Sequence, residues 1–444
     1  MLQAFRLPWL LVLVGAGLAL AGCSDSATPS GSTSTTTAGV QVYSSQKARL
    51  TAASVPNSDV QAAAGWSNSL GASLYGALKD AAPSGNLMFS PYSAEIALAM
   101  TAQGAKGATA TQMNKVLGFT LPEAQVHPAL GALDLALTSR GATAKGKDDQ
   151  PFRLKIANST WGQKGYSFAQ AFLDGCKVNY GANLNGVDFV KDAEAARLLI
   201  NQWVLEATEK KIKDLIPKGA VDSLTRLVLV NAIYFNAAWM YPFAATATKD
   251  GPFTTLAGTT VTVPRMYQQE TFAYQAEALW QSVALPYDGQ ELEMVVVLPA
   301  AGKLADVEAL IASGGFAQFG AKATSVPVKL TLPRWKLDWS ASLAKTLQTL
   351  GMTDAFDPAK ADLSGIGGTK GELLITDVLQ KTFVAVDEKG TEAAAATAVI
   401  VGTTGMPLNP VELVVDRPFL WLIRDVATGA VLFVGRVADP SQAQ

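Results

Sequence analysis

The sequence predicts an α+β fold in one large domain, and three observations lead to this prediction. Apolar residues recur at helical spacing from about residue 62 to 79 and again from 94 to 103, which indicates helices near the start of the body. Later runs, such as 294–299 and 330–333, are apolar and stopped by proline, as strands often are. No linker rich in proline, glycine and serine follows residue 60 and no internal repeat is present, so we expect one body over residues 59–444.

Composition excludes several classes of function. The 444 residues are 49% hydrophobic with a formal net charge of -2, so the chain can bury a large core and has no basic field for nucleic acid. The one histidine, His127, cannot by itself build a nucleophilic triad or a histidine-rich metal site. No Walker loop or dinucleotide-binding glycine motif is present. We therefore expect no metal, no cofactor and no catalysis, although carboxylate-only or serine–lysine chemistry stays open as an alternative.

The first residues have the pattern of an export signal. Arg6 precedes an apolar run at 7–21, which is shorter than the ~20 residues that a membrane-spanning helix needs. The run ends in Leu-Ala-Gly-Cys23, which resembles a bacterial lipobox. We predict a lipoprotein signal peptide at 1–22, lipidation of Cys23, and a flexible tether at 23–58 whose first part is rich in serine and threonine. An ordinary signal peptide with an incidental cysteine is the alternative.

This pattern also predicts a location. The protein is expected to be exported and held on the cell envelope by its lipid, or to be extracellular. Ser24, in place of aspartate, resembles lipoproteins that are forwarded to an outer membrane. If Cys23 is lipidated, Cys176 has no partner, so the exported body is expected to be held together without a disulfide.

The most unusual segment of the chain is residues 388–399. It begins with the permissive Gly390, continues with four consecutive alanines that favour a helix, and leads into the β-branched run 399–401, which favours a strand. As a strand, it would place Glu392 on one face and only small, uncharged side chains on the other: Thr391, Ala393, Ala395, Thr397, Val399 and Val401. An exposed helix followed by a sheet strand is the alternative.

Several blocks of sequence, in order, resemble the serpin family. They include Asn-Leu-Met-Phe-Ser-Pro-Tyr-Ser at 86–93, Gly-Ala-Lys-Gly-Ala-Thr at 104–109, the apolar run 227–235, the segment 388–399, and Arg-Pro-Phe with Phe-Val-Gly-Arg near the C-terminus. The resemblance covers roughly residues 60 to 440. It implies the serpin fold, with three β-sheets, eight to nine α-helices and an exposed reactive-centre loop from about residue 390 to 410.

The resemblance also implies roles for individual residues. The region where the central sheet opens would contain Ser90, Ser93, Asn231 and Gln380. The loop would enter the sheet beside Arg334 and Trp239. The hinge of the loop would consist of Glu388, Gly390, Thr391, Glu392, Ala393, Ala394, Ala395, Ala396 and Thr397. Gln380 stands where many serpins have histidine, and its amide cannot titrate near neutral pH, so we expect opening of the sheet without that pH dependence.

The mechanism that the resemblance implies is inhibition by a suicide substrate. A serine or cysteine protease would cleave the loop, the freed half would insert as a strand, and the protease would be trapped as an acyl-enzyme. Counting from Glu388 places the reactive bond at Thr404–Gly405, and counting back from Pro418 places it near Met406 and Pro407. No lysine or arginine lies between residues 389 and 417, which favours an elastase-like target, or a chymotrypsin-like one if Met406 is used.

Alternatives to inhibition remain open at this point. The chain is expected to be a monomer whose partners are a target protease and, through Cys23, a membrane, with no nucleic acid. One alternative is a non-inhibitory serpin fold that serves as a binding or chaperone-like surface lipoprotein. A structural lipoprotein or an enzyme of unseen mechanism is the other.

Overall fold

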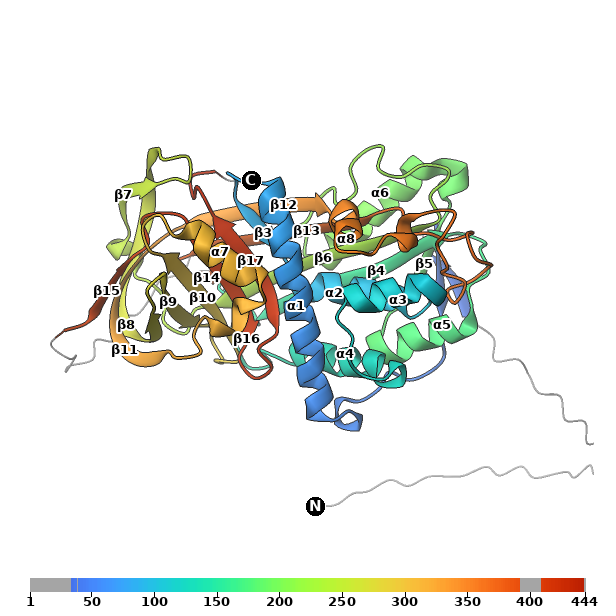
Figure 1. The fold of residues 1–444 in the computed structure, drawn as a ribbon, viewed down its shortest axis with the longest axis horizontal. Coiled ribbons are helices and arrows are strands. Elements are labelled where there is room, and N and C mark those ends of the chain that lie inside the picture. The colour runs from blue at the N-terminus through green and yellow to red at the C-terminus, as the bar shows by residue number, and fades with distance from the viewer. Residues whose placement is uncertain (1–32, 38, 392–408, 443–444) are drawn as a thin grey trace, which may run out of the picture. The chain divides into compact units, whose positions relative to one another are not determined.

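Two large β-sheets organise the part of the chain that the computed structural model describes, which is residues 33–37, 39–391 and 409–442 (Figure 1). Sheet A has the strand order β1 (Thr33–Thr37), β2 (Val40–Ser44), β5 (Leu184–Val187), β4 (Arg153–Gln163), β6 (Leu227–Ala238), β14 (Gly390–Thr391), β13 (Val378–Asp387) and β12 (Trp335–Ser342). Sheet B has the order β15 (Val411–Val414), β11 (Thr324–Pro333), β8 (Thr260–Ala276), β9 (Trp280–Pro286), β10 (Leu292–Pro299), β16 (Phe419–Asp425), β17 (Val431–Val437) and β3 (Leu87–Phe89), and β7 (Lys249–Thr254) pairs with β8.

The helices agree with the predicted fold class, and the number of sheets differs from it. The described residues contain eight α-helices: α1 (Asn57–Ala81), α2 (Pro91–Ala102), α3 (Gly107–Val116), α4 (Glu123–Thr138), α5 (Gln170–Gly175), α6 (Phe189–Ala207), α7 (Leu304–Ala312) and α8 (Ala344–Thr349). Short helical turns lie at η1 (Ala52–Ser54), η2 (Cys176–Tyr180), η3 (Ala245–Ala247), η4 (Gly315–Gln318) and η5 (Asp354–Phe356). Three sheets were expected, whereas the described strands form two hydrogen-bonded sheets. The 17-residue strand β8 pairs with β7, β11 and β9 and so joins them into sheet B.

Sheet A is buried on both faces near its middle. On one face, Ile200 and Val204 of α6 form an apolar cluster with Val228 and Val230 of β6. On the other face, the alternate residues of β6, such as Ile233, pack in a cluster that includes residues of α2. The predicted helix at 94–103 is thus α2, and all twelve of its residues are buried. A strand inserted into this sheet would have helices on both sides of it.

The C-terminal strand pair, β16 and β17, is buried within sheet B. All seven residues of β17 are buried, and β17 pairs antiparallel with β16 on one side and with β3 on the other. A β-carbon at Gly435 would lie 2.6 Å from the Leu87 carbonyl oxygen and 2.8 Å from the Trp421 ring. Only glycine fits there, which explains the glycine in the motif Phe-Val-Gly-Arg.

The segment before α1 differs from its prediction as a flexible tether over residues 23–58. From Val40 onward it belongs to the folded body, because β2 pairs antiparallel with the edge of β5 and β1 adds a further strand outside β2. The chain then follows the surface, where Ser45 Oγ donates to Asp174 at 2.6 Å and the Leu50 amide donates to the Val178 carbonyl at 2.9 Å. The unpaired edge of a sheet can accept a strand of modest hydrophobicity, which composition alone does not reveal.

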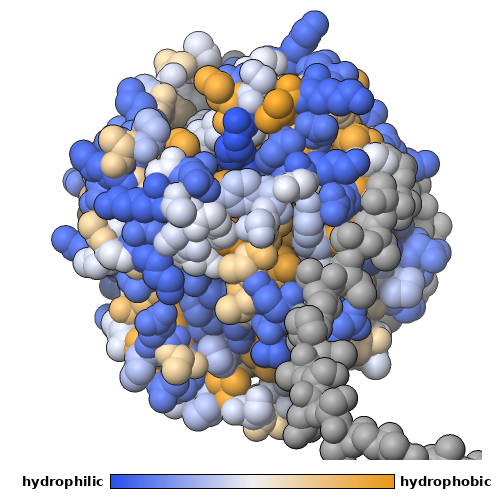
Figure 2. Space-filling view, turned by 90° about the vertical axis from the view of Figure 1, so that its right-hand side faces the viewer, coloured by the Kyte–Doolittle hydropathy of each residue, from blue (hydrophilic) through white to orange (hydrophobic). Residues whose placement is uncertain are grey.

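The end of the molecule where α6 and β5 lie is seen face-on in Figure 2, and its surface there is mostly hydrophilic with small, separate apolar areas. Within the described ranges, no helix has the length and apolar character to cross a membrane. The predicted signal peptide and Cys23 fall outside those ranges, and Cys176 is buried with an unpaired thiol.

Candidate functional site

The hinge of the predicted loop begins inside sheet A. Gly390 and Thr391 form β14, which pairs antiparallel with Ala238 and Ala237 of β6 on one side and with Asp387 and Val386 of β13 on the other. Thr391 is fully buried, and its hydroxyl lies 2.7 Å from the hydroxyl of Tyr287. A β-carbon at Gly390 would lie 2.0 Å from the Ala237 carbonyl oxygen, so this close approach requires glycine.

Trp239 fixes the chain immediately before the hinge. Its indole Nε1 donates to the Asp387 carbonyl at 2.9 Å, and its ring stacks on Tyr287 with centroids 4.6 Å apart. The Trp239 amide also donates to the Lys389 carbonyl at 2.8 Å. Trp239 therefore lies beside β14 and holds the backbone that leads into it; its role in loop entry stays a prediction.

An ion pair joins the base of the loop to the start of β12. Arg334 Nε donates to Glu388 Oε1 at 2.8 Å, and Arg334 Nη2 and the hydroxyl of Thr248 donate to the same oxygen. Burial opposes ionisation of Glu388, but the hydrogen bonds from Arg334 and Thr248 outweigh it and lower the pKa of the carboxyl. The predicted contact between Arg334 and Glu388 is therefore present, although Arg334 is half-exposed and the pair is worth little by itself.

Below β14, the strands β6 and β13 pair directly with each other. Six parallel pairs join Leu229–Tyr234 to Val378–Phe383, and we call these pairs the seam. Asn231 lies opposite Gln380 in the seam, and Gln380 Nε2 donates to Asn231 Oδ1 at 2.7 Å. A strand that lengthens β14 along the whole of β13 has to break these six pairs and this side-chain hydrogen bond.

A buried polar network ties the seam to the start of α2. Gln380 exchanges two hydrogen bonds of 3.0 Å with the backbone of Ser90, and Asn231 Nδ2 donates to Asn158 Oδ1 at 3.0 Å. Ser93 Oγ donates to the same oxygen of Asn158 at 2.8 Å. The four predicted residues are thus brought together, and each is fully buried. Asn158 was missed as a member, because β4 contains several polar residues and a single amide does not stand out there as Asn231 does in the apolar strand β6.

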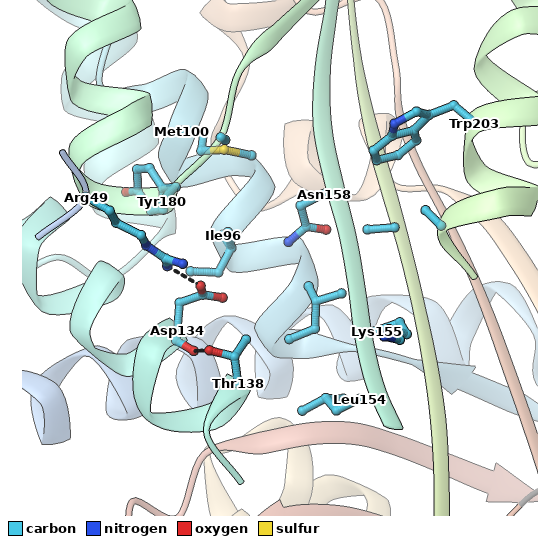
Figure 3. Close-up of a pocket in the computed structure, with 14 residues that line it drawn as sticks. Arg49, Ile96, Met100, Asp134, Thr138, Leu154, Lys155, Asn158, Tyr180 and Trp203 are labelled. Carbon is cyan, nitrogen blue, oxygen red and sulfur yellow. Dashed lines mark hydrogen bonds and ion pairs between the residues drawn. The ribbon is translucent and has the colours of Figure 1, made fainter. Parts of the chain in front are cut away.

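A cavity of about 370 Å³ lies beside the outer edge of β4 (Figure 3). β5 pairs only with Thr160–Gln163, so among the described strands the first half of β4 has a neighbour on its β6 side alone. Ile96 and Met100 of α2 line the cavity together with Asn158, and an ion pair between Arg49 and Asp134 lies at its other side. Space is therefore present on the side toward which β4 and β6 have to move if the seam opens.

The other predicted site residues lie outside the described ranges. These are the hinge residues Glu392, Ala393, Ala394, Ala395, Ala396 and Thr397, and the residues of the reactive bond, Thr404, Gly405, Met406 and Pro407. The chain is described again from Asn409 and enters β15, which pairs parallel with β11 at the edge of sheet B. His127 is partly buried, its Nδ1 lies 2.6 Å from the hydroxyl of Tyr180, and burial lowers its pKa to about 4. In the described ranges, no cluster of three or more histidine, cysteine or acidic residues could hold a metal ion.

Comparisons with known proteins assign the fold. The family model described as Serpin (serine protease inhibitor) matches residues 66–440. Leukocyte elastase inhibitor A of Mus musculus is 40% identical over 376 residues, covering 83% of this chain and 96% of the relative, and antithrombin-III of the same species is 38% identical over 364 residues, covering 80% and 76%. The crystal structure of Serpin48 from the insect Tenebrio molitor superposes with a TM-score of 0.75 at 32% identity and covers 85% of this chain and 98% of that one. Human thyroxine-binding globulin superposes with a TM-score of 0.76 at 27% identity, covering 86% and 100%.

The matches extend over most of the chain, and the seam, the strand β14 and the polar network lie within the matched residues. The chain therefore belongs to the serpin family, a family of serine protease inhibitors and not of enzymes.

Proposed function

We propose that this serpin inhibits an elastase-like serine protease by inserting its own cleaved loop between β6 and β13. One observation carries the proposal: the first two loop residues, Gly390 and Thr391, are already paired with both strands. Strand addition by serpin loop insertion is an established mode of β-augmentation, and here the register supports it independently.

The register of β14 can be continued residue by residue. Thr391 lies opposite Ala237 and Val386, so an antiparallel strand would place Val399 opposite both Leu229 and Val378. These two residues are partners in the present seam. The registers of β6 and β13 therefore agree, and a strand from Gly390 to Val401 would pair with all twelve residues of β6 without a slip.

The faces of the inserted strand suit the layers around sheet A. Ala237 and Ile233 pack on the side of α2, so alternation would place Ala393, Ala395 and Val399 on that same buried face. Thr397 would fall opposite Asn231 and Gln380, where its hydroxyl could replace the hydrogen bond that insertion breaks. Every side chain on this face would be small and uncharged, which is what a buried position without a charged partner requires.

Insertion would move an attached protease along the full length of the sheet. Thirteen residues separate Thr391 from Thr404, and at about 3.3 Å per residue this is a displacement of roughly 43 Å. If cleavage leaves the protease esterified to Thr404, the protease is carried to the end of sheet A where β13 begins. Strain on the attached protease then opposes hydrolysis of the acyl-enzyme.

The sequence around the reactive bond supports an elastase-like target. No basic residue lies from 390 to 416, so a trypsin-like pocket has nothing to bind, whereas the small side chain of Thr404 suits a shallow apolar pocket. The names of several relatives, leukocyte elastase inhibitors, point in the same direction. Cleavage at Met406–Pro407 would place proline after the bond, which makes it the poorer substrate.

An incubation with elastase, chymotrypsin and trypsin tests the proposal. We expect a complex with elastase that survives SDS, together with a released C-terminal fragment whose mass places its N-terminus at Gly405. A fragment that begins at Pro407 would move the bond to Met406 and favour chymotrypsin, and one that begins at Leu408 would place the bond after Pro407; either result would overturn cleavage after Thr404. Cleavage of the loop without any SDS-stable complex, with all serine and cysteine proteases tried, would leave a non-inhibitory binding protein.

A further inference from the structure

The segment at residues 40–50 runs from the edge of sheet A to the helices beside it, and we call it the strap (Figure 1). It begins with β2, in which Tyr43 lies opposite Leu184 of β5. Tyr43 is buried, its ring lies edge-on to Phe168 with centroids 4.9 Å apart, and its hydroxyl accepts a hydrogen bond of 2.9 Å from the Gly165 amide. Both the backbone and a buried side chain therefore attach the strap to the sheet.

The middle of the strap is attached to α5 and to η2. Ser45 Oγ donates to Asp174 Oδ1 at 2.6 Å, and Lys47 Nζ lies 2.9 Å from the second oxygen of the same carboxylate. The Leu50 amide donates to the Val178 carbonyl at 2.9 Å. Side chains and backbone thus both hold this part of the strap on the helical layer.

The end of the strap reaches α4 at the wall of the cavity shown in Figure 3. Arg49 Nη2 forms an ion pair with Asp134 Oδ2. The hydroxyl of Tyr92 on α2 donates to the other oxygen of Asp134 at 2.6 Å. At the other end of α2, Gln103 Nε2 donates to the Phe172 carbonyl of α5 at 3.2 Å. The strap is therefore anchored on two helices that are themselves hydrogen-bonded to α2.

One row of paired residues connects the strap to the seam. Val378 of β13 lies opposite Leu229 of β6, which lies opposite Thr160 of β4. Thr160 pairs with Leu184 of β5, and Leu184 pairs with Tyr43 of the strap. If the seam opens between Val378 and Leu229, the whole row from Leu229 to Tyr43 has to move away from Val378.

The strap has too little slack to follow this movement. A strand that enters the seam widens it by about 4.8 Å, the spacing of neighbouring strands. Only Ser44 separates Tyr43 on the sheet from Ser45 on α5, and an extended chain spans at most about 7 Å over this distance, nearly all of which β2 already uses. The helices cannot simply follow the row, because Ser90 at the start of α2 is hydrogen-bonded to Gln380 on the other side of the seam. Opening therefore requires that the strap leave α5 and α4, or that β2 leave β5.

We propose that the strap is a restraint on sheet A, which keeps the seam closed until its contacts with α5 and α4 are released. The inference rests on the proposed function, because it concerns the opening that loop insertion requires. The contacts to be released are modest one by one, since the side chain of Lys47 is 61% exposed and that of Arg49 is 29% exposed. The restraint thus sets the rate at which the seam opens and contributes no residue to the inserted strand.

Hydrogen exchange of backbone amides tests this proposal without a protease. In the full chain, Arg49→Gln removes the ion pair with Asp134, and the double variant Ser45→Ala with Lys47→Met removes both contacts with Asp174. We expect each variant to speed exchange in peptides that cover the seam, at residues 229–234 and 378–383, about threefold to tenfold, as for the loss of one partly exposed ion pair. Exchange in β10 of sheet B should change by less than a factor of two.

Arg424→Gln provides a matched control. Arg424 Nε donates to Glu293 at 2.7 Å, and the two side chains are 18% and 17% exposed, but this ion pair joins β16 to β10 in sheet B. We expect Arg424→Gln to leave exchange at the seam within a factor of two of the original protein. Unchanged exchange at the seam in both strap variants, or an equal increase in both sheets, would overturn the restraint. Failure of the unmodified protein to form any SDS-stable complex would instead overturn the proposed function and leave the exchange result standing.

Discussion

Replacement of Thr391 by arginine tests the insertion mechanism at its first residue. Thr391 is fully buried between β6 and β13 and shares a hydrogen bond of 2.7 Å with Tyr287. A guanidinium group at this position would either be buried without a partner or pull β14 out of the sheet. In the second case the strand pairs of Gly390 and Thr391 and the contact with Tyr287 are lost. We therefore expect the free energy of unfolding to fall by about 2 to 4 kcal/mol, at roughly 1 kcal/mol per hydrogen bond.

The effect on inhibition should be larger than the effect on stability. Each 1.4 kcal/mol added to the insertion barrier slows insertion tenfold, so a penalty of about 3 kcal/mol for a buried, unpaired charge slows it roughly a hundredfold. Hydrolysis of the acyl-enzyme then precedes insertion, and Thr391→Arg becomes a substrate. Titration of a fixed amount of elastase, with gels that separate complex from cleaved protein, measures this partition.

Two variants control for this result. Thr391→Ser keeps a small side chain and the hydroxyl that contacts Tyr287, so it should inhibit as the original protein does. Leu408→Arg adds the same charge on the other side of the predicted bond, in the half of the loop that does not insert. Inhibition by Thr391→Arg at the original stoichiometry would refute insertion of this segment.

Three further predictions concern other parts of the chain. The partly buried His127 has its pKa lowered to about 4, so the unfolded chain binds a proton that the folded chain does not as pH falls below 6.5. The free energy of unfolding should therefore fall by about 3 kcal/mol between pH 6.5 and 4, at 1.36 kcal/mol per pKa unit. Urea unfolding of His127→Gln should lack this part of the dependence on pH. An equal dependence on pH in both proteins would contradict this prediction. Gln380→His should introduce a pH dependence between pH 5 and 8 into the rate of elastase trapping, whereas a pH-dependent rate in the original protein over that range would mean that another group controls the seam. If Cys23 is lipidated as the sequence predicts, Cys23→Ser should release the protein from membranes with inhibition intact, and retention of the variant in the membrane fraction would contradict the predicted lipobox.

The residues of the central site could be predicted mainly because the sequence resembles the serpin family, and two of them also interrupt strong local patterns. Asn231 is an amide within an apolar strand, and Gly390 with its small neighbours contradicts both helix and strand composition, so each marks a position with a special role. Asn158 of β4 is also an amide in a strand, but β4 contains other polar residues, so Asn158 does not stand out in the sequence. The polar network only becomes visible when β4, β6, β13 and α2 are packed together.

Other features depend on contacts between distant segments. In the pairing of β2 with β5, Tyr43 lies opposite Leu184. The composition before residue 58 does not indicate that this segment pairs with a strand so far along the chain. The long strand β8 joins β7, β11 and β9, so the described strands form two sheets where the resemblance implied three. Lys147 lies in a charged, glycine-containing stretch that is typical of an exposed loop, and its burial follows only from the position of Asn236.

The most direct test of the account is a crystal structure of the protein after cleavage in its loop. Our account predicts that Thr391 continues into a full strand between β6 and β13, that Val399 lies opposite Leu229 and Val378, and that Thr397 contacts Gln380. A cleaved protein in which Leu229 still pairs directly with Val378, as it does in the seam described above, would contradict the claim that the loop of this serpin inserts.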